Sequence, residues 1–202
     1  MKLYYSPGTC SLSPHIVARE AGIDLTLDKV DLATKKTSGG RDYLAINPKG
    51  YVPTLELDDK RTITEGPAIV QYLADQKPES GLAPANGTFE RYKLQEMLNY
   101  ITSELHKSYS PLFRKETPAE TRDERLAYLR KRYQLIDHLL EGRSLLFGDR
   151  FSVADAYLFA VTRWAAGVKL DLSEFKHLQA WQQRVAERPA VQDAMKAEGL
   201  IK

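Results

Sequence analysis

The stretch "YYSPGTCSLSPHIVAREAG", residues 4–22, places a predicted strand directly before a predicted helix. The strand, "KLYYS" (2–6), is short and aromatic and ends at a Pro-Gly pair. Apolar residues then recur at helical spacing from Ser11 to Ala21, and a glycine follows as a C-terminal stop. Because Pro14 is tolerated only in the first turn of a helix, this helix must begin close after Cys10, the only cysteine of the chain.

The rest of the first 80 residues also alternates between strands and helices. The sequence predicts strands at "TLDKVDL" (26–32), "TLEL" (54–57) and "RTIT" (61–64), and a helix at "GPAIVQYLADQ" (66–76). The order is β-α-β, a poorly defined middle, then β-β-α. This order is typical of a small mixed sheet with helices on its faces.

A change of composition at "QKPESGLAPANGT" (76–88) separates this region from the rest of the chain. The segment is rich in Pro, Gly and small polar residues, as linkers are. We place the linker at residues 81–88, between domains of residues 1–80 and 89–202. Every later periodic segment is helical, with helices expected at 89–109, 119–142, 152–167 and 174–189, the last of them stopped by Pro189. The second domain is therefore predicted to be all-α.

Composition excludes several classes of function. The 202 residues include 29 Lys and Arg against 27 Asp and Glu, and this balance gives no reason to expect a nucleic-acid partner. No secretory signal or membrane span is found, and a single cysteine suits a reducing compartment, so we expect a soluble, cytoplasmic protein without a membrane partner. The four histidines lie too far apart for ligand spacing, so we expect no metal.

Cys10 is the first candidate for chemistry. A thiol at a helix N-terminus can have its pKa lowered from ~8.5 to roughly 3.5–7.5, because the helix dipole favours the thiolate. Such a thiolate can attack disulfides or be capped by a small thiol. The alternative is a small buried side chain without a chemical role.

Two further motifs could bind a peptide-like ligand. If Val52 in "GYVPTLEL" precedes a cis Pro53, its N–H and C=O are free to pair with an extended ligand; the alternative is an ordinary edge-strand proline. At the strand-to-helix junction "TITEGP", Glu65 could accept from an ammonium while the Gly66 N–H holds a carboxylate. The alternative is that Glu65 merely caps the helix.

The second domain carries a polar stripe and a folding signal. At helical spacing, Asn99, Ser103 and His106 share a face that lies toward solvent or toward a cleft, and His106 would be a candidate proton carrier near a thiol. In "FSVADAYLF", Ser152 and Asp155 have capping-box spacing before an apolar helix, and we interpret this motif as structural.

Four motifs together resemble those of the bacterial beta-class glutathione transferases. They are "KLYYSPGTCSLSPHIVARE", "NPKGYVPTLELDD", "ITEGPAIVQYLAD" and "FSVADAYLF", and the resemblance covers essentially the whole chain. It implies an α/β thioredoxin-like N-terminal domain, an all-α C-terminal domain, glutathione as co-substrate in the cleft between them, and a homodimer.

The resemblance also implies roles for individual residues. Cys10 would lie near the glutathione sulfur, with His106 as the second catalytic residue, and Tyr5 and Ser11 are fallback hydroxyl donors. The residues implied to bind glutathione, including those that come over the site from the helical domain, are Cys10, Lys35, Val52, Pro53, Glu65, Gly66, Asn99, Ser103, Glu104, Leu105 and His106. Of these, Asn99 would serve the partner subunit's site.

The expected activity is transfer of the glutathione thiolate to small hydrophobic electrophiles, without a metal. The electrophile pocket would be lined by Tyr109, Phe113 and Trp164. One alternative is glutathione-dependent thiol-disulfide exchange through a Cys10 mixed disulfide. Another is a non-catalytic ligand-binding module.

Overall fold

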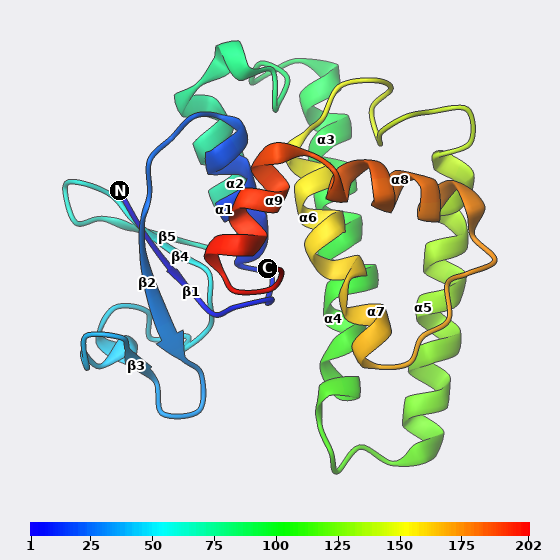
Figure 1. The fold of residues 1–202 in the computed structure, drawn as a ribbon, viewed down its shortest axis with the longest axis horizontal. Helices are drawn as coiled ribbons and strands as arrows, with labels where there is room; N and C mark the ends of the chain where they lie inside the picture. Colours follow the sequence, from blue (N-terminus) through cyan, green and yellow to red (C-terminus); the bar gives the residue numbers. More distant parts are fainter.

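The computed structural model describes residues 1–202 and has two parts that lie side by side (Figure 1). One part holds a five-stranded sheet in the order β3-β2-β1-β4-β5. The strands are β1 Lys2–Tyr5, β2 Thr26–Asp31, β3 Lys36–Thr37, β4 Thr54–Glu56 and β5 Thr62–Thr64. β1 and β2 are parallel and the other pairs are antiparallel. The mixed sheet is confirmed, but β3, only two residues long, falls in the middle segment for which the sequence predicts no element.

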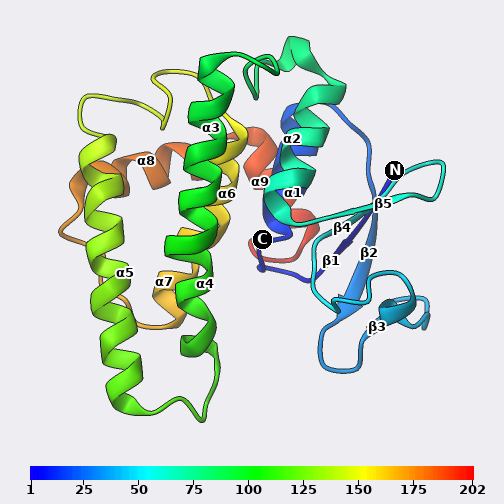
Figure 2. The same cartoon turned by 180° about the vertical axis from the view of Figure 1, so that it is seen from behind.

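Helices α1 (Leu12–Glu20) and α2 (Gly66–Gln76) pack against each other between the sheet and the helical part (Figure 2). Their apolar faces share a core with β4, in which Ile16 and Leu55 are fully buried. On β1, Leu3 lies opposite Leu55, so the next residue, Tyr4, points to the other face of the sheet. There Tyr4 joins a small separate cluster that includes Tyr43 and Val52. This second cluster supports the loop that leads into β4.

The helical part confirms the all-α prediction. Its elements are α3 Phe89–Tyr100, a π-helix Ile101–His106, α4 Lys107–Tyr109, α5 Ala119–Leu139, α6 Val153–Thr162, α7 Trp164–Gly167, α8 Lys176–Ala186 and α9 Pro189–Ala197. Short 3-10 turns lie at Tyr43–Ala45, Pro78–Ser80 and Ser110–Phe113. As expected for a helix apolar all round, α6 is buried along its whole length. No helix is both long enough and apolar enough to cross a membrane.

The expected continuous helix at 89–109 is wrong in one respect, because the π-helix replaces its α-helical geometry from Ile101 to His106. A π-helix forms i→i+5 hydrogen bonds, so each of its turns holds more residues than a turn of α-helix. The faces that the 3.6-residue period predicts are therefore rotated beyond Ile101. Asn99 is exposed on α3, whereas His106 is partly buried.

The prediction that the last helix is simply stopped by Pro189 is incomplete. α8 ends at Ala186, and Pro189 begins a further helix, α9, in the first-turn position that suits proline. α9 packs on α1 of the first part. The division into residues 1–80, a linker at 81–88 and 89–202 remains our proposal, and it describes the order along the chain, since α9 returns to the N-terminal part.

The capping box before α6 is confirmed. The Ser152 hydroxyl accepts from the Asp155 N–H at 3.4 Å, and the Asp155 carboxylate accepts from the Ser152 N–H at 3.0 Å. The carboxylate also accepts from the Leu146 N–H (3.0 Å) and from the Trp181 indole (2.9 Å). Asp155 therefore joins α6, α8 and the loop before α6, and does more than cap one helix.

Candidate active site

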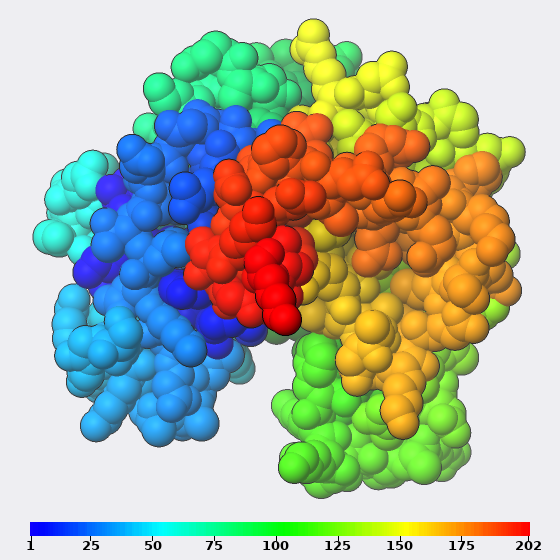
Figure 3. All heavy atoms as spheres, in the orientation of Figure 1, coloured from blue at the N-terminus to red at the C-terminus, as the bar shows by residue number.

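A cleft of about 640 Å³ lies between the sheet part and the helical part. In the space-filling view the surface is hollowed between the two parts, below the C-terminal segment (Figure 3). The lining comes from the loop after β1, the β2–β3 loop, the loop before β4, the β5–α2 junction, and the residues from Thr102 to Phe113, with Tyr157 and Trp164 behind them. Most of these segments are ones that the sequence motifs mark, and Tyr157 itself belongs to the motif "FSVADAYLF".

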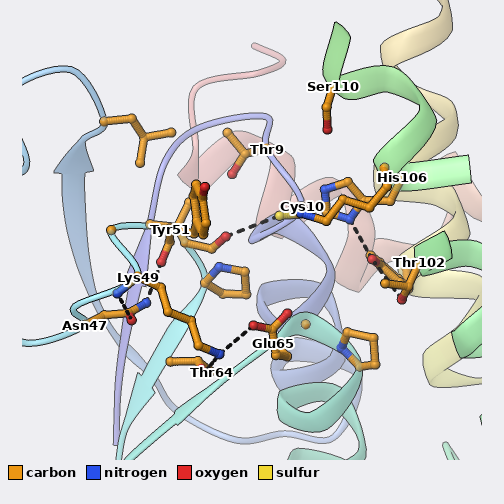
Figure 4. Close-up of a pocket in the computed structure, with 18 of the residues that line it drawn as sticks. Thr9, Cys10, Asn47, Lys49, Tyr51, Thr64, Glu65, Thr102, His106 and Ser110 are labelled. Carbon is orange, nitrogen blue, oxygen red and sulfur yellow. Dashed lines mark hydrogen bonds and ion pairs between the residues drawn. The ribbon is translucent and has the colours of Figure 1, made fainter. Parts of the chain in front are cut away.

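Cys10 lies at the bottom of the loop after β1, immediately before α1, and is only 9% exposed. Its Sγ donates to the Val52 carbonyl oxygen at 3.4 Å (Figure 4). Burial raises the pKa of the Cys10 thiol to about 12. The expected lowering of this pKa is therefore wrong: nearby backbone N–H groups and Lys107 do act in that direction, but loss of hydration outweighs them. The thiol is a neutral hydrogen-bond donor.

The loop before β4 presents its backbone to the cleft. The Val52–Pro53 peptide bond is cis, and both residues line the cavity. The preceding turn is held from below, because the Tyr43 hydroxyl and the Asn47 amide both donate to the Tyr51 carbonyl, at 2.7 and 2.8 Å. The Val52 N–H has no acceptor within the protein. A free N–H beside the Cys10 thiol is available to an extended ligand.

Glu65 occupies the junction between β5 and α2 with a positive φ of 68°. Residues other than glycine rarely adopt this backbone conformation, and it is found where structure or function requires it. The Glu65 side chain makes no capping bond to α2, which contradicts the simple capping interpretation. It pairs instead with Lys49 Nζ at 2.7 Å in the cleft (Figure 4). The next residue, Gly66, has an unpaired N–H at the start of α2, where anions are favoured.

Three lysines give the cleft a positive rim. Lys35 Nζ donates to the Gly50 carbonyl at 2.9 Å, and Lys49 also reaches the Thr64 hydroxyl at 3.0 Å. Lys107 lies over the Tyr51 ring, with Nζ 5.7 Å from the ring centroid. Only the first of these lysines was named from the sequence. Lys49 lies inside the quoted motif "NPKGYVPTLELDD" and Lys107 directly follows His106, so these positions were the available signal.

His106 closes the cleft from the helical side. Its Nδ1 lies 2.6 Å from the Tyr157 hydroxyl oxygen of α6, and its ring meets the Trp164 ring edge-on at a centroid distance of 5.0 Å. Burial lowers the pKa of His106 to about 4, and the adjacent Lys107 lowers it further in the same direction. The imidazole is thus neutral near pH 7. Tyr157 belongs to the motif "FSVADAYLF", which was interpreted as a folding signal, so its contact with His106 was not predicted.

Two family models match the chain. Residues 8–76 match the glutathione S-transferase N-terminal domain, and residues 97–189 match the glutathione S-transferase C-terminal domain. A curated relative, glutathione S-transferase GstA of Escherichia coli O157:H7, is 52% identical over 200 residues, covering 99% of this chain and 100% of the relative. The chain belongs to the glutathione S-transferase family.

Two solved structures are similar over the full length of the chain. A sphingomonad glutathione S-transferase complexed with glutathione has a TM-score of 0.96 and 47% identity, with 100% of both chains covered. A beta-class glutathione S-transferase of Sphingomonas chungbukensis has a TM-score of 0.96 and 46% identity, again with 100% of both chains covered. The resemblance to the bacterial beta class and the glutathione S-transferase fold are thereby confirmed.

The structure does not bring every residue implied by that resemblance into this chain's cleft. Asn99 and Ser103 are exposed on the outer side of the helix, and Leu105 is fully buried in the core. Glu104 turns toward α5, where it accepts from the Tyr128 hydroxyl at 2.5 Å. The π-helix accounts for this distribution, since it turns His106 inward while its neighbours in sequence face the core, α5 or solvent.

The aromatic wall is smaller than expected. Phe113 and Trp164 line the cleft, but Tyr109 is fully buried and donates to the Tyr133 hydroxyl at 3.0 Å. Tyr109 lies behind the wall, stacked on Phe113 at a centroid distance of 6.1 Å. The fallback residue Ser11 is also fully buried and, like Tyr5, lies outside the cleft lining. No three His, Cys, Asp or Glu side chains come together as a metal site.

Proposed function

We propose that this glutathione transferase conjugates the thiolate of glutathione to small hydrophobic electrophiles in the cleft at Cys10. The observation that carries the proposal is that four features surround one cavity: the free Val52 N–H, the Glu65–Gly66 junction, the Cys10 thiol and the His106 ring. Glutathione has an extended peptide backbone, and the sphingomonad relative is complexed with it. The exposed backbone at Val52, with charged side chains on either side of it, can bind such a ligand.

The charges of glutathione match the polar groups of the cleft. We assign the glycine carboxylate to Lys35, the cysteinyl backbone to Val52 beside Pro53, the γ-glutamyl ammonium to Glu65 and its carboxylate to the Gly66 N–H. Charge-assisted hydrogen bonds of this kind are the stronger ones in proteins. They would hold the thiol of glutathione next to Cys10 and His106.

Activation of the thiol then relies on hydrogen-bond donors. A donor aimed at a developing thiolate lowers the pKa of that thiol. Since Cys10 is itself a neutral thiol, it suits the role of donor better than that of nucleophile. The electrophile would pack against Phe113 and Trp164, the apolar side of the cleft.

Replacement of Cys10 separates conjugation from the mixed-disulfide alternative. In Cys10→Ala we expect conjugation of an aryl halide to fall only about 2- to 10-fold, the effect of losing one hydrogen-bond donor, and Cys10→Ser to recover most of the loss. Retention on immobilised glutathione should persist in both variants. Initial rates with saturating glutathione, together with the intact mass of the untreated protein, provide the measurement.

Other outcomes would decide against this assignment. Complete loss of conjugation in both variants would show that Cys10 is more than one hydrogen-bond donor. Loss of mixed-disulfide reduction in Cys10→Ala, with a glutathione-sized adduct on the native protein, would make Cys10 a nucleophile in disulfide exchange. Retention of apolar dyes with turnover near the uncatalysed rate would support the non-catalytic binding module. No retention on glutathione would overturn the proposed function itself.

We also propose that the protein is a homodimer that uses the outer face of α3. Phe89 and Tyr92 are 73% and 61% exposed, and Asn99 and Ser103 follow them at spacings that return to the same helix face. A second subunit seated there would cover the two aromatic rings and bring Asn99 to its own cleft. Sedimentation equilibrium should then give twice the 22.9 kDa chain mass at micromolar concentration, and a fully active single chain would refute the dimer.

A further inference from the structure

The motif "FSVADAYLF" carries a residue that its structural role does not explain. Tyr157 lies on α6 two residues after the capping aspartate, and its side chain is almost completely buried. A buried Phe would fill the same apolar space. The hydroxyl instead reaches the wall of the cleft and lies 2.6 Å from His106 Nδ1.

The direction of this hydrogen bond follows from the groups around it. The Tyr157 hydroxyl has one proton, and His106 Nδ1 lies 2.6 Å from its oxygen; the more distant Thr102 Oγ1, at 3.4 Å, is oriented to donate to Tyr157 and not to accept from it. The Thr102 hydroxyl already donates to the Leu98 carbonyl at 2.8 Å. A phenol is the better donor and a neutral imidazole nitrogen the better acceptor, so the proton of the short bond belongs to Tyr157.

We propose that Tyr157 is a positioning residue that holds His106 in the Nε2–H tautomer, so that the imidazole donates a hydrogen bond into the cleft. If Nδ1 accepts from Tyr157, the single proton of a neutral ring must lie on Nε2. Nε2 bonds to no other group of the protein, and the ring lines the cleft. The edge-on contact with Trp164 at 5.0 Å restrains the ring in this orientation.

The group that accepts from His106 Nε2–H is assigned on the basis of the proposed function: it is the thiolate of bound glutathione. His106 would then act beside Cys10, whose thiol donates to the Val52 carbonyl here and would turn its one proton to the same thiolate when glutathione binds. The ring donates as a neutral imidazole, which agrees with the lowered pKa of His106, and it keeps its Nε2 proton in this step. The hydroxyl of Tyr157 does not touch the ligand and acts only through the ring.

Nitrogen-15 NMR of the imidazole groups tests the tautomer without any substrate. The spectrum of the native protein should show His106 with Nδ1 unprotonated and Nε2 protonated, and the signal is assigned by its loss in His106→Ala. An Nδ1–H tautomer would overturn the inference whether or not the protein is active. This readout is also independent of the proposed function, because glutathione is absent from the sample.

A double-mutant cycle tests the effect on activity. Tyr157→Phe should lower the rate of aryl halide conjugation at saturating glutathione by about 3- to 10-fold and reduce the thiolate absorbance of bound glutathione near 240 nm. In a His106→Ala background the same change should have no further effect. Equal losses in both backgrounds would mean that Tyr157 does not act through His106.

Tyr133→Phe is the matched control. It also removes one buried hydroxyl of the helical part, hydrogen-bonded at 3.0 Å to Tyr109, but Tyr133 lies outside the cleft lining. It should leave the rate and the thiolate absorbance unchanged. If Tyr133→Phe lowers both as much as Tyr157→Phe does, the losses come from weakened packing and the positioning role is refuted.

Discussion

Asp155→Ala is expected to destabilise the protein by about 3–5 kcal/mol, because it removes the acceptor of several buried donors at once. The carboxylate accepts from the N–H groups of Leu146 and Ser152, from the Ser152 hydroxyl at 2.7 Å and from the Trp181 indole. All of these lie in the buried junction of α6, α8 and the preceding loop. Burial raises the pKa of Asp155, and the hydrogen bonds from Leu146, Ser152 and Trp181 act in the opposite direction.

The measurement is thermal and urea unfolding of the native protein and two variants. For a chain of this length, the expected loss corresponds to a melting temperature lower by about 10 °C. Ser152→Ala is the matched control, since it removes only the hydroxyl of the capping box and should cost about 1 kcal/mol. Equal losses in the two variants would show that Asp155 serves only as a helix cap.

Glu65→Gln is expected to raise the KM for glutathione by about 10- to 100-fold with little change in kcat, as loss of a charged hydrogen bond would. The amide keeps the length of the side chain and its backbone conformation but cannot form an ion pair with the γ-glutamyl ammonium. Because that end of glutathione does not react, its contact contributes equally to the bound substrate and to the transition state. Initial-rate kinetics at varied glutathione provide the test.

Glu79→Gln is the control for this variant. Glu79 also belongs to an exposed lysine pair, with Lys77 Nζ at 3.9 Å, but lies in the turn after α2 and outside the cleft. The KM of Glu79→Gln for glutathione should equal that of the native protein. A fall in kcat with unchanged KM in Glu65→Gln would instead place Glu65 in the chemical step, contrary to its assignment.

Local sequence signals sufficed wherever the cause of the structure is local. The predicted helix at 66–76 agrees with α2 because its glycine-proline start and apolar period lie within the segment itself. The capping box was predicted for the same reason. The π-helix at 101–106 was not predicted, because a constant 3.6 residues per turn makes the whole segment look like one regular α-helix. α9 was missed because Pro189, which marks its start, was interpreted only as the end of the helix before it.

The sequence by itself determined the class of fold, the order of its elements and the position of one thiol between β1 and α1. Its motifs also pointed to the segments that form most of the cleft. Only the tertiary structure decided that the thiol is neutral, that Lys49 pairs with Glu65 and that Tyr157 faces His106. The physical reason is that hydration and hydrogen bonding depend on distances in space: Val52 is 42 residues from Cys10, and Tyr157 is 51 residues from His106.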